Sequence, residues 1–173
     1  MVHEDHSDGL LFEKVYEHVY PVLYRVAYRI TGSASRAEDL CHEAFIRYLE
    51  RGELLPDLDQ TKYWLIRVLR NLSLNDEKKR AREYRAYQRY EKNSRTAEQP
   101  ADQGVLDAEA RGVVQQALDG LPYKLRVVLV LKEYGQMSYR EIGKLLGITE
   151  GNVKVRAFRA REQLAQSLRD ALP

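Results

Sequence analysis

The stretch that decides the fold is residues 138–164, which read SYREIGKLLGITEGNVKVRAFRAREQL. Ser138 and Glu141 have the spacing of a capping box, so a short helix is expected to begin here. Gly147 supplies a left-handed turn, and Thr149 is suited to cap a second helix. A capped helix, a glycine turn and a second capped helix predict a helix-turn-helix. A two-helix hairpin without a DNA-binding role is the alternative.

The second helix of this motif favours DNA binding over a plain hairpin. Steps of about 100° per residue place Val153, Ala157 and Ala160 on one face, which is expected to be core. The opposite side carries Val155 and Phe158 among cations. In a major groove, apolar side chains can meet thymine methyl groups while cations reach phosphates or guanine edges. The candidate contacts to duplex DNA are Asn152, Lys154, Val155, Arg156, Phe158 and Arg159. Packing on a neighbouring helix is the alternative for Phe158.

The rest of the chain has helical periodicity and no strand alternation of any length. The segment 94–104, SRTAEQPADQG, has almost no large apolar residue and is typical of a flexible linker. The sequence therefore predicts the all-α class, with two small helical domains joined by that linker. We expect the N-terminal domain over residues 10–93 and the C-terminal domain, which contains the helix-turn-helix, over residues 105–170.

Helix-breaking and helix-capping residues divide the N-terminal domain into helices. Pro21 predicts two helices or one kinked helix before the stop at Gly32. Ser35 and Glu38 have capping-box spacing and predict the start of the next helix, which Gly52 ends. A third helix is expected from about residue 60. In the C-terminal domain a first amphipathic helix is expected to bury Leu106, Ala110, Val113, Val114, Ala117 and Leu118.

The third helix carries an unusual stripe opposite its leucines. At steps of three and four it runs through Trp64, Arg67, Asn71, Asn75 and Lys78, and then Arg82. An aromatic ring can stack on an unpaired base, amides can bond to base edges, and cations follow the backbone. The stripe is therefore a candidate site for single-stranded DNA. The alternatives are that Trp64 is a core residue and that the cations form a solvated face.

The second helix has an acidic outer face and a buried cysteine. Its outward stripe runs through Asp39, Glu43, Ile46 and Glu50, beside Arg47, and favours a protein-binding patch. Cys41 next to His42 raises an enzyme as a rival interpretation. Cys41 is expected to face the core, and no second ligand cluster accompanies it, so we expect neither an enzyme nor a metal site, and no cofactor.

Composition and charge exclude several other classes of protein. The net charge is +2, and the single cysteine excludes an internal disulfide and a cysteine-based zinc cluster. Residues 1–75 carry net −3, residues 76–95 net +4, residues 96–120 net −4 and residues 121–173 net +5. Alternating blocks favour separate surfaces for separate partners. The apolar runs are too short to span a bilayer, so we expect a cytoplasmic protein without membrane insertion.

Three stretches of the sequence resemble the sigma-70 family, in its short extracytoplasmic-function group. They are AEDLCHEAFIRYL (37–49), YWLIRVLRNLSLNDEKKR (63–80) and the whole of 121–164. The resemblance implies a transcription initiation factor that binds core RNA polymerase through its beta and beta-prime subunits. It also implies that region 2 reads and melts the −10 promoter element, that region 4 reads the −35 element, and that an anti-sigma factor is a partner.

Individual positions carry over from this resemblance. Those matching polymerase contacts are Asp39, Leu40, Glu43, Phe45 and Arg47. Asn71 matches the residue at the pocket for a flipped −10 base, and Lys154, Arg156, Phe158 and Arg159 match −35 contacts. His42 replaces a usual glutamine, and Val155 replaces a small polar residue. The rival function outside this family is a stand-alone regulator that binds a palindrome as a dimer.

Overall fold

The computed structural model describes residues 4–93 and 112–172, and within these ranges the regular secondary structure is entirely helical. The all-α class is confirmed. The expected linker 94–104 lies outside the described residues, as do Leu106 and Ala110. The helices are α1 (Glu4–Thr31), α2 (Ala34–Glu50), α3 (Leu58–Asn93), α5 (Tyr123–Glu133), α6 (Tyr139–Leu146) and α7 (Glu150–Ala171), with a further helical segment at 112–119.

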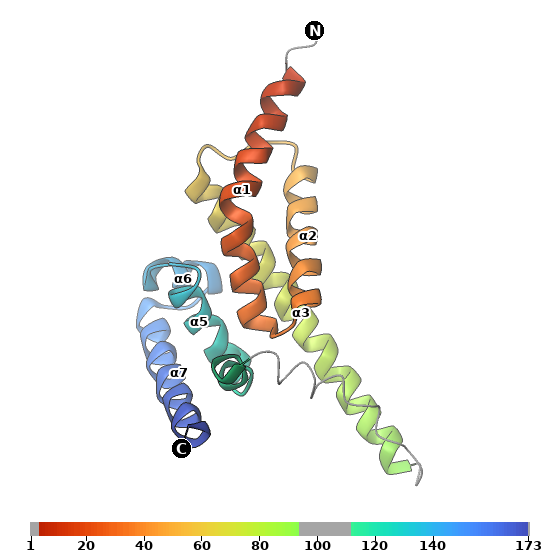
Figure 1. Ribbon diagram of the computed structural model, residues 1–173, viewed down its shortest axis with the longest axis vertical. Coiled ribbons are helices and arrows are strands. Elements are labelled where there is room, and N and C mark those ends of the chain that lie inside the picture. The colour runs from red at the N-terminus through yellow and green to blue at the C-terminus, as the bar shows by residue number, and fades with distance from the viewer. Residues whose placement is uncertain (1–3, 94–111, 173) are drawn as a thin grey trace.

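Helices α1, α2 and α3 form an N-terminal bundle beside which the C-terminal helices lie (Figure 1). Helix α1 is one helix with Pro21 inside it, so of the two alternatives for this stretch the single helix is the one that forms. Proline removes one backbone hydrogen bond. Buried side chains on both sides of it, including Val19 and Leu23, continue the same apolar face and offset that cost.

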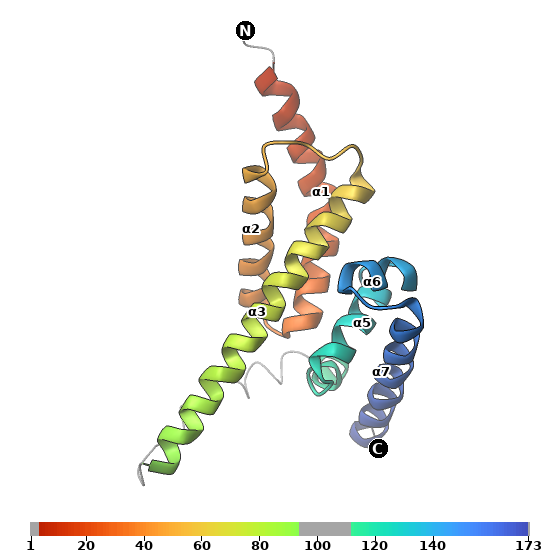
Figure 2. The same cartoon turned by 180° about the vertical axis from the view of Figure 1, so that it is seen from behind.

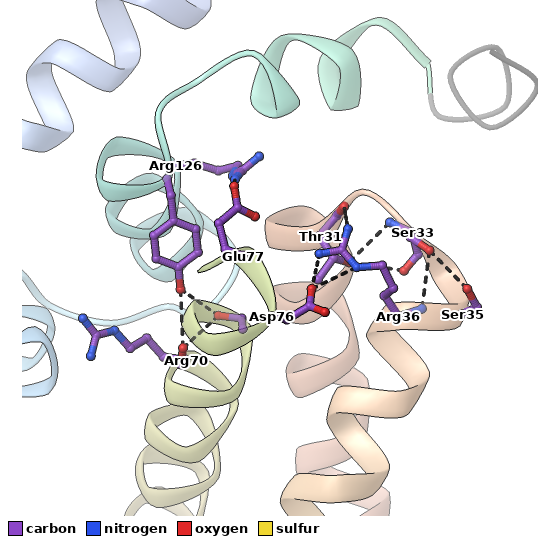
Figure 3. Close-up of polar contacts among 10 residues, drawn as sticks. Thr31, Ser33, Ser35, Arg36, Arg70, Asp76, Glu77 and Arg126 are labelled. Atoms are coloured by element: carbon purple, nitrogen blue, oxygen red, sulfur yellow. Dashed lines mark hydrogen bonds and ion pairs between the residues drawn. The ribbon is translucent and has the colours of Figure 1, made fainter. Parts of the chain in front are cut away.

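Helix α2 begins two residues earlier than expected. Gly32 has φ +65°, and Ser33 is the residue that caps α2, through its Oγ and the backbone N–H of Arg36 at 3.4 Å. The capping box expected from Ser35 is therefore wrong. The Arg36 side chain is held by Asp76 of α3, with Nε donating to the carboxylate at 3.0 Å (Figure 3). This contact joins the start of α2 to the middle of α3.

The helix-turn-helix forms as predicted. Ser138 and Glu141 make the reciprocal capping box of α6, and the Thr149 hydroxyl accepts from the Asn152 N–H at 3.1 Å to cap α7. Gly147 has φ +70°, the conformation that favours glycine. A Cβ at Gly143 would lie 2.8 Å from the carbonyl oxygen of Ile148, so α6 and the turn can approach this closely only over a glycine.

The two modules pack against each other. One apolar cluster includes α1 residues such as Val26 and α5 residues such as Val128 and Leu131. Gln115 is fully buried; its Oε1 accepts from Arg29 Nη1 at 3.1 Å and its Nε2 donates to the Arg29 carbonyl at 3.3 Å.

This polar contact corrects one expectation about the segment 112–119. Ala117 and Leu118 are buried as predicted, but Val113 and Val114 are 39 % and 45 % exposed. The inner face of the segment meets the end of α1, where a carbonyl and a guanidinium require a polar partner. Gln115 supplies that partner, so the valines turn outward.

Candidate nucleic-acid and polymerase interfaces

Helix α7 has a buried side and an exposed side. Val153, Ala157 and Ala160 are fully buried, as predicted. Val155 is 48 % exposed and Phe158 is 62 % exposed, so packing of Phe158 on a neighbouring helix is wrong. Two large apolar side chains of α7 therefore face solvent, and packing in a core does not explain why they are apolar.

Polar and cationic side chains surround these apolar residues. Asn152, Lys154 and Arg159 are exposed, and Arg156 is half-buried. Arg156 Nε donates to Asn152 Oδ1 at 3.1 Å, which ties the guanidinium to the preceding turn of α7. Lys154 lies 3.5 Å from the Glu150 carboxylate, one turn back along the helix. An exposed pair of this kind is weak and can exchange for a phosphate.

The start of α7 adds two cations that the sequence reasoning did not select. A shallow hollow at the turn is lined by Arg140 and Lys144 of α6 and by residues 147–150. The N-terminal N–H groups of α7 and the helix dipole favour an anion there. The capping box at Ser138 could have pointed to these cations, because it fixes which α6 residues face the turn.

The stripe on α3 is largely solvent-facing. Arg67, Asn71, Asn75 and Lys78 are exposed, whereas Trp64 is half-buried. The Trp64 ring packs on Tyr48 with the centroids 5.8 Å apart, and the Arg51 guanidinium lies 5.6 Å from its centroid. The ring is thus held between α2 and α3 with part of its surface free.

The outer face of α2 mixes charges with exposed aliphatic side chains. Asp39 is exposed, and Glu43 and Arg47 form an ion pair of 3.0 Å. Ile46 is 48 % exposed and Leu49 is 57 % exposed, and the sequence reasoning did not select Leu49. Leu40 is half-buried.

Phe45 differs from the other α2 candidates because it is buried, with an edge-to-face contact to Phe12 of α1 at 6.1 Å. It therefore holds α2 on α1 rather than facing a partner. Beside this contact α1 carries a ladder of tyrosines at four-residue spacing, with successive ring centroids 4.8, 6.2 and 6.3 Å apart: Tyr16, Tyr20, Tyr24 and Tyr28. That spacing is visible in the sequence.

Cys41 has the properties of a core residue. Its side chain is fully buried, and burial raises the pKa of the thiol to about 12. A thiol with this pKa is protonated near neutral pH and is a poor nucleophile. Among residues 4–93 and 112–172, no three His, Cys, Asp or Glu side chains are grouped to hold a metal ion, and no helix could cross a membrane.

Comparison with known proteins gives two family matches that together span most of the chain. Residues 15–83 match Sigma-70 region 2, and residues 111–164 match Sigma-70 region 4. The chain is 32 % identical over 148 residues to the ECF RNA polymerase sigma factor SigW of Bacillus subtilis, covering 80 % of this chain and 79 % of that protein. It is 32 % identical over 165 residues to the ECF RNA polymerase sigma factor SigL of Mycobacterium tuberculosis strain H37Rv, covering 95 % and 92 %.

A solved structure shares the fold. The sigma factor RpoE of Bartonella quintana, crystallised with the anti-sigma factor NepR, superposes with a TM-score of 0.68 at 26 % identity. The superposition covers 91 % of this chain and 96 % of that chain.

Proposed function

This chain belongs to the ECF RNA polymerase sigma factors of the sigma-70 family, and on that premise we propose which of its surfaces serve each partner. As a sigma factor for transcription initiation it binds core RNA polymerase and promoter DNA. A stand-alone dimeric regulator is not favoured. We assign polymerase docking and −10 capture to residues 10–93 and −35 recognition to residues 105–170, joined by the linker 94–104.

The outer face of α2 docks on core polymerase. Exposed Ile46 and Leu49 can form the desolvated centre of an interface, and Asp39, Glu43 and Arg47 can form its polar rim. Leu40 lies at the edge of this patch. Phe45 acts indirectly, because its contact with Phe12 sets the position of α2.

The α3 stripe captures unpaired bases of the −10 element. Asn71 and Asn75 offer donors and acceptors for base edges. Arg67 and Lys78 lie on the same stripe and can bind the phosphates of that strand. The free part of Trp64 is suited to stack on a base. Removing a base from the duplex costs a few kcal/mol, which these contacts must repay.

Helix α7 reads the −35 duplex. Lys154, Arg156 and Arg159 have the chemistry for phosphates and guanine edges, and Val155 and Phe158 for thymine methyls. Arg140 and Lys144 of α6 are placed to hold a phosphate at the start of α7.

We further propose an anti-sigma factor as a partner, since the B. quintana relative was crystallised with one. The exposed aliphatic patch on α2, which polymerase would otherwise cover, is a surface that such a protein could mask. We assign the chain to the cytoplasm, where polymerase acts, and assign it no catalytic residue or cofactor.

The exposure of Val155 and Phe158 on a basic helix is the observation that carries this proposal. The test is run-off transcription with core polymerase on genomic fragments enriched by holoenzyme binding. We expect transcripts that require the chain, and that Phe158→Ala reduces. A chain that fails to bind core polymerase, and that binds a palindromic fragment as a dimer, would contradict the proposal.

A further inference from the structure

The last third of α3 leaves the bundle. Figures 1 and 2 both show it running past the ends of α1 and α2. From residue 78 to residue 92 every described side chain is exposed except Tyr87, which is half-buried. No apolar core in the described parts of the chain accounts for this extension. Its sequence, KKRAREYRAYQRYEK, has seven Lys/Arg and two Asp/Glu.

The cations of the extension are sorted onto one face. At about 100° per residue, Lys78, Arg82, Arg85, Arg89 and Lys92 fall within a sector of about 80°. The same sector contains Arg67 and Asn71 further up the helix, and Asn75 lies about 20° beyond its edge. We call Arg82, Arg85, Arg89 and Lys92 the distal stripe. It continues in a straight line the stripe assigned above to unpaired −10 bases.

Neither acid of the extension compensates this stripe. Glu83 lies well off the sector and pairs with Lys79 at 3.9 Å, and Glu91 lies on the opposite side of the helix. Arg85 Nε donates to the Ala81 carbonyl at 3.2 Å, which uses one of its five donors. Like charges three and four residues apart disfavour a helix by a few tenths of a kcal/mol per pair. A bound polyanion would remove that repulsion.

The chemistry of the line changes along its length. The upper part has an aromatic ring and two amides, which suit bases. The distal stripe has only cations, while Tyr84 and Tyr90, 63 % and 67 % exposed, lie on the other side of the helix. A surface with cations and no stacking or base-edge group binds phosphates without reading sequence.

We propose that the distal stripe binds the phosphate backbone of duplex DNA adjoining the melted −10 segment. This location rests on the proposed function of Asn71 and its neighbours. Arg82 to Lys92 span about 15 Å along the helix axis. That length matches about four base pairs of one strand at 3.4 Å each. The extension thus anchors the duplex next to the strand that the upper stripe holds open.

The experiment compares two variants of the full chain that lose equal charge from the same helix. The stripe variant is Arg85→Gln with Arg89→Gln; the control is Lys79→Gln with Arg80→Gln, whose residues lie outside the sector. Affinity for a fluorescent 20-bp duplex of mixed sequence and for a 20-nucleotide oligo-dT is measured over a salt series. The stripe variant should lower the salt slope on the duplex by about 1.8, from two lost phosphate contacts, and the control should leave it unchanged.

A third variant, Arg85→Lys with Arg89→Lys, separates charge from helix stability. It should keep the parental slope, because a lysine also binds a phosphate as a point charge. An equal loss in the control variant would overturn the proposal, since net charge alone would then explain it. If the stripe variant lost affinity for oligo-dT only, the partner of the distal stripe would be single-stranded DNA. If it lost affinity for core polymerase with unchanged DNA binding, the partner would be a protein. Either result overturns the proposal. The duplex assay needs no melting, so its failure leaves the Asn71 assignment untouched.

Discussion

The Tyr123 hydroxyl lies 2.7 Å from the Ser73 hydroxyl, and this pair joins α5 to α3 across the boundary between the two modules. Beside it, Arg126 Nη2 donates to Glu77 Oε1 at 3.3 Å (Figure 3). The Arg126 side chain is 8 % exposed and the Glu77 side chain 40 %. The contact between α5 and α3 therefore includes a nearly buried cation with one carboxylate partner.

This geometry predicts an asymmetry between the two residues of the ion pair. Glu77→Gln leaves the Arg126 charge buried without its carboxylate and, because Glu77 itself is partly exposed, should lower the free energy of unfolding by about 1–3 kcal/mol. Arg126→Met removes the charge and keeps apolar volume, so it should cost less. Urea denaturation measures both, with small-angle scattering to report whether the modules separate. A larger loss for Arg126→Met would contradict this and would show that the other contacts of Arg126, with the Asp119 carbonyl and the Tyr123 ring, outweigh the cost of its buried charge.

The Tyr123 hydroxyl should contribute modestly to the free energy of unfolding. Tyr123→Phe leaves Ser73 still donating to the Arg70 carbonyl at 2.9 Å, so no buried donor loses its partner. We expect a loss of about 1 kcal/mol by urea denaturation. Burial raises the pKa of Tyr123, so the neutral phenol is favoured in the folded chain. The contribution of the buried neutral phenol to stability is complete below about pH 10 and is lost as the pH rises through the pKa of Tyr123 in the folded chain.

Cys41 should be inert in the folded protein. Because burial raises the pKa of its thiol to about 12 from an ordinary value of 9.0, the neutral thiol contributes stability that is complete below about pH 9 and is lost as the pH rises toward 12. A thiol reagent at pH 8 should react with Cys41 only as fast as the chain unfolds. Cys41→Ala should retain core-polymerase binding and transcription. Abolished function in a folded Cys41→Ala chain would revive an enzyme using Cys41 and His42.

Reversing the charge of Asp39 and Glu43 to lysine should abolish core-polymerase binding while the fold survives. Both side chains lie outside the core, so the free energy of unfolding should change by only about 0.5 kcal/mol each. Reversal of exposed Glu13 and Glu17 on α1 is the matched control, and core binding is measured by pull-down. Unchanged affinity for the first variant would remove this face of α2 from the interface.

Local patterns predicted the parts of this fold that depend on neighbours in sequence. The Ser138 capping box, the turn at Gly147 and the two faces of α7 are each set within one or two helical turns. Periodicity also identified the exposed Asn71 line on α3.

The wrong expectation for Val113 and Val114 has its cause in a contact with a distant residue. Gln115 is buried because Arg29 lies against it, 86 positions away. Neither periodicity nor spacing reports such partners.

The most direct test of the central claim, that one module holds unpaired bases and the other reads duplex DNA, compares Asn71→Ala with Arg159→Ala in holoenzyme. Transcription is measured on a duplex promoter and on the same promoter with a pre-opened −10 bubble. Asn71→Ala should form closed complexes normally, fail at melting, and regain activity in part on the bubble, where unpairing is already complete. Arg159→Ala should weaken binding to the −35 duplex by about 1–3 kcal/mol and be rescued less. Impaired −35 binding by Asn71→Ala, with bubble formation unaffected, would contradict the division of labour between α3 and α7.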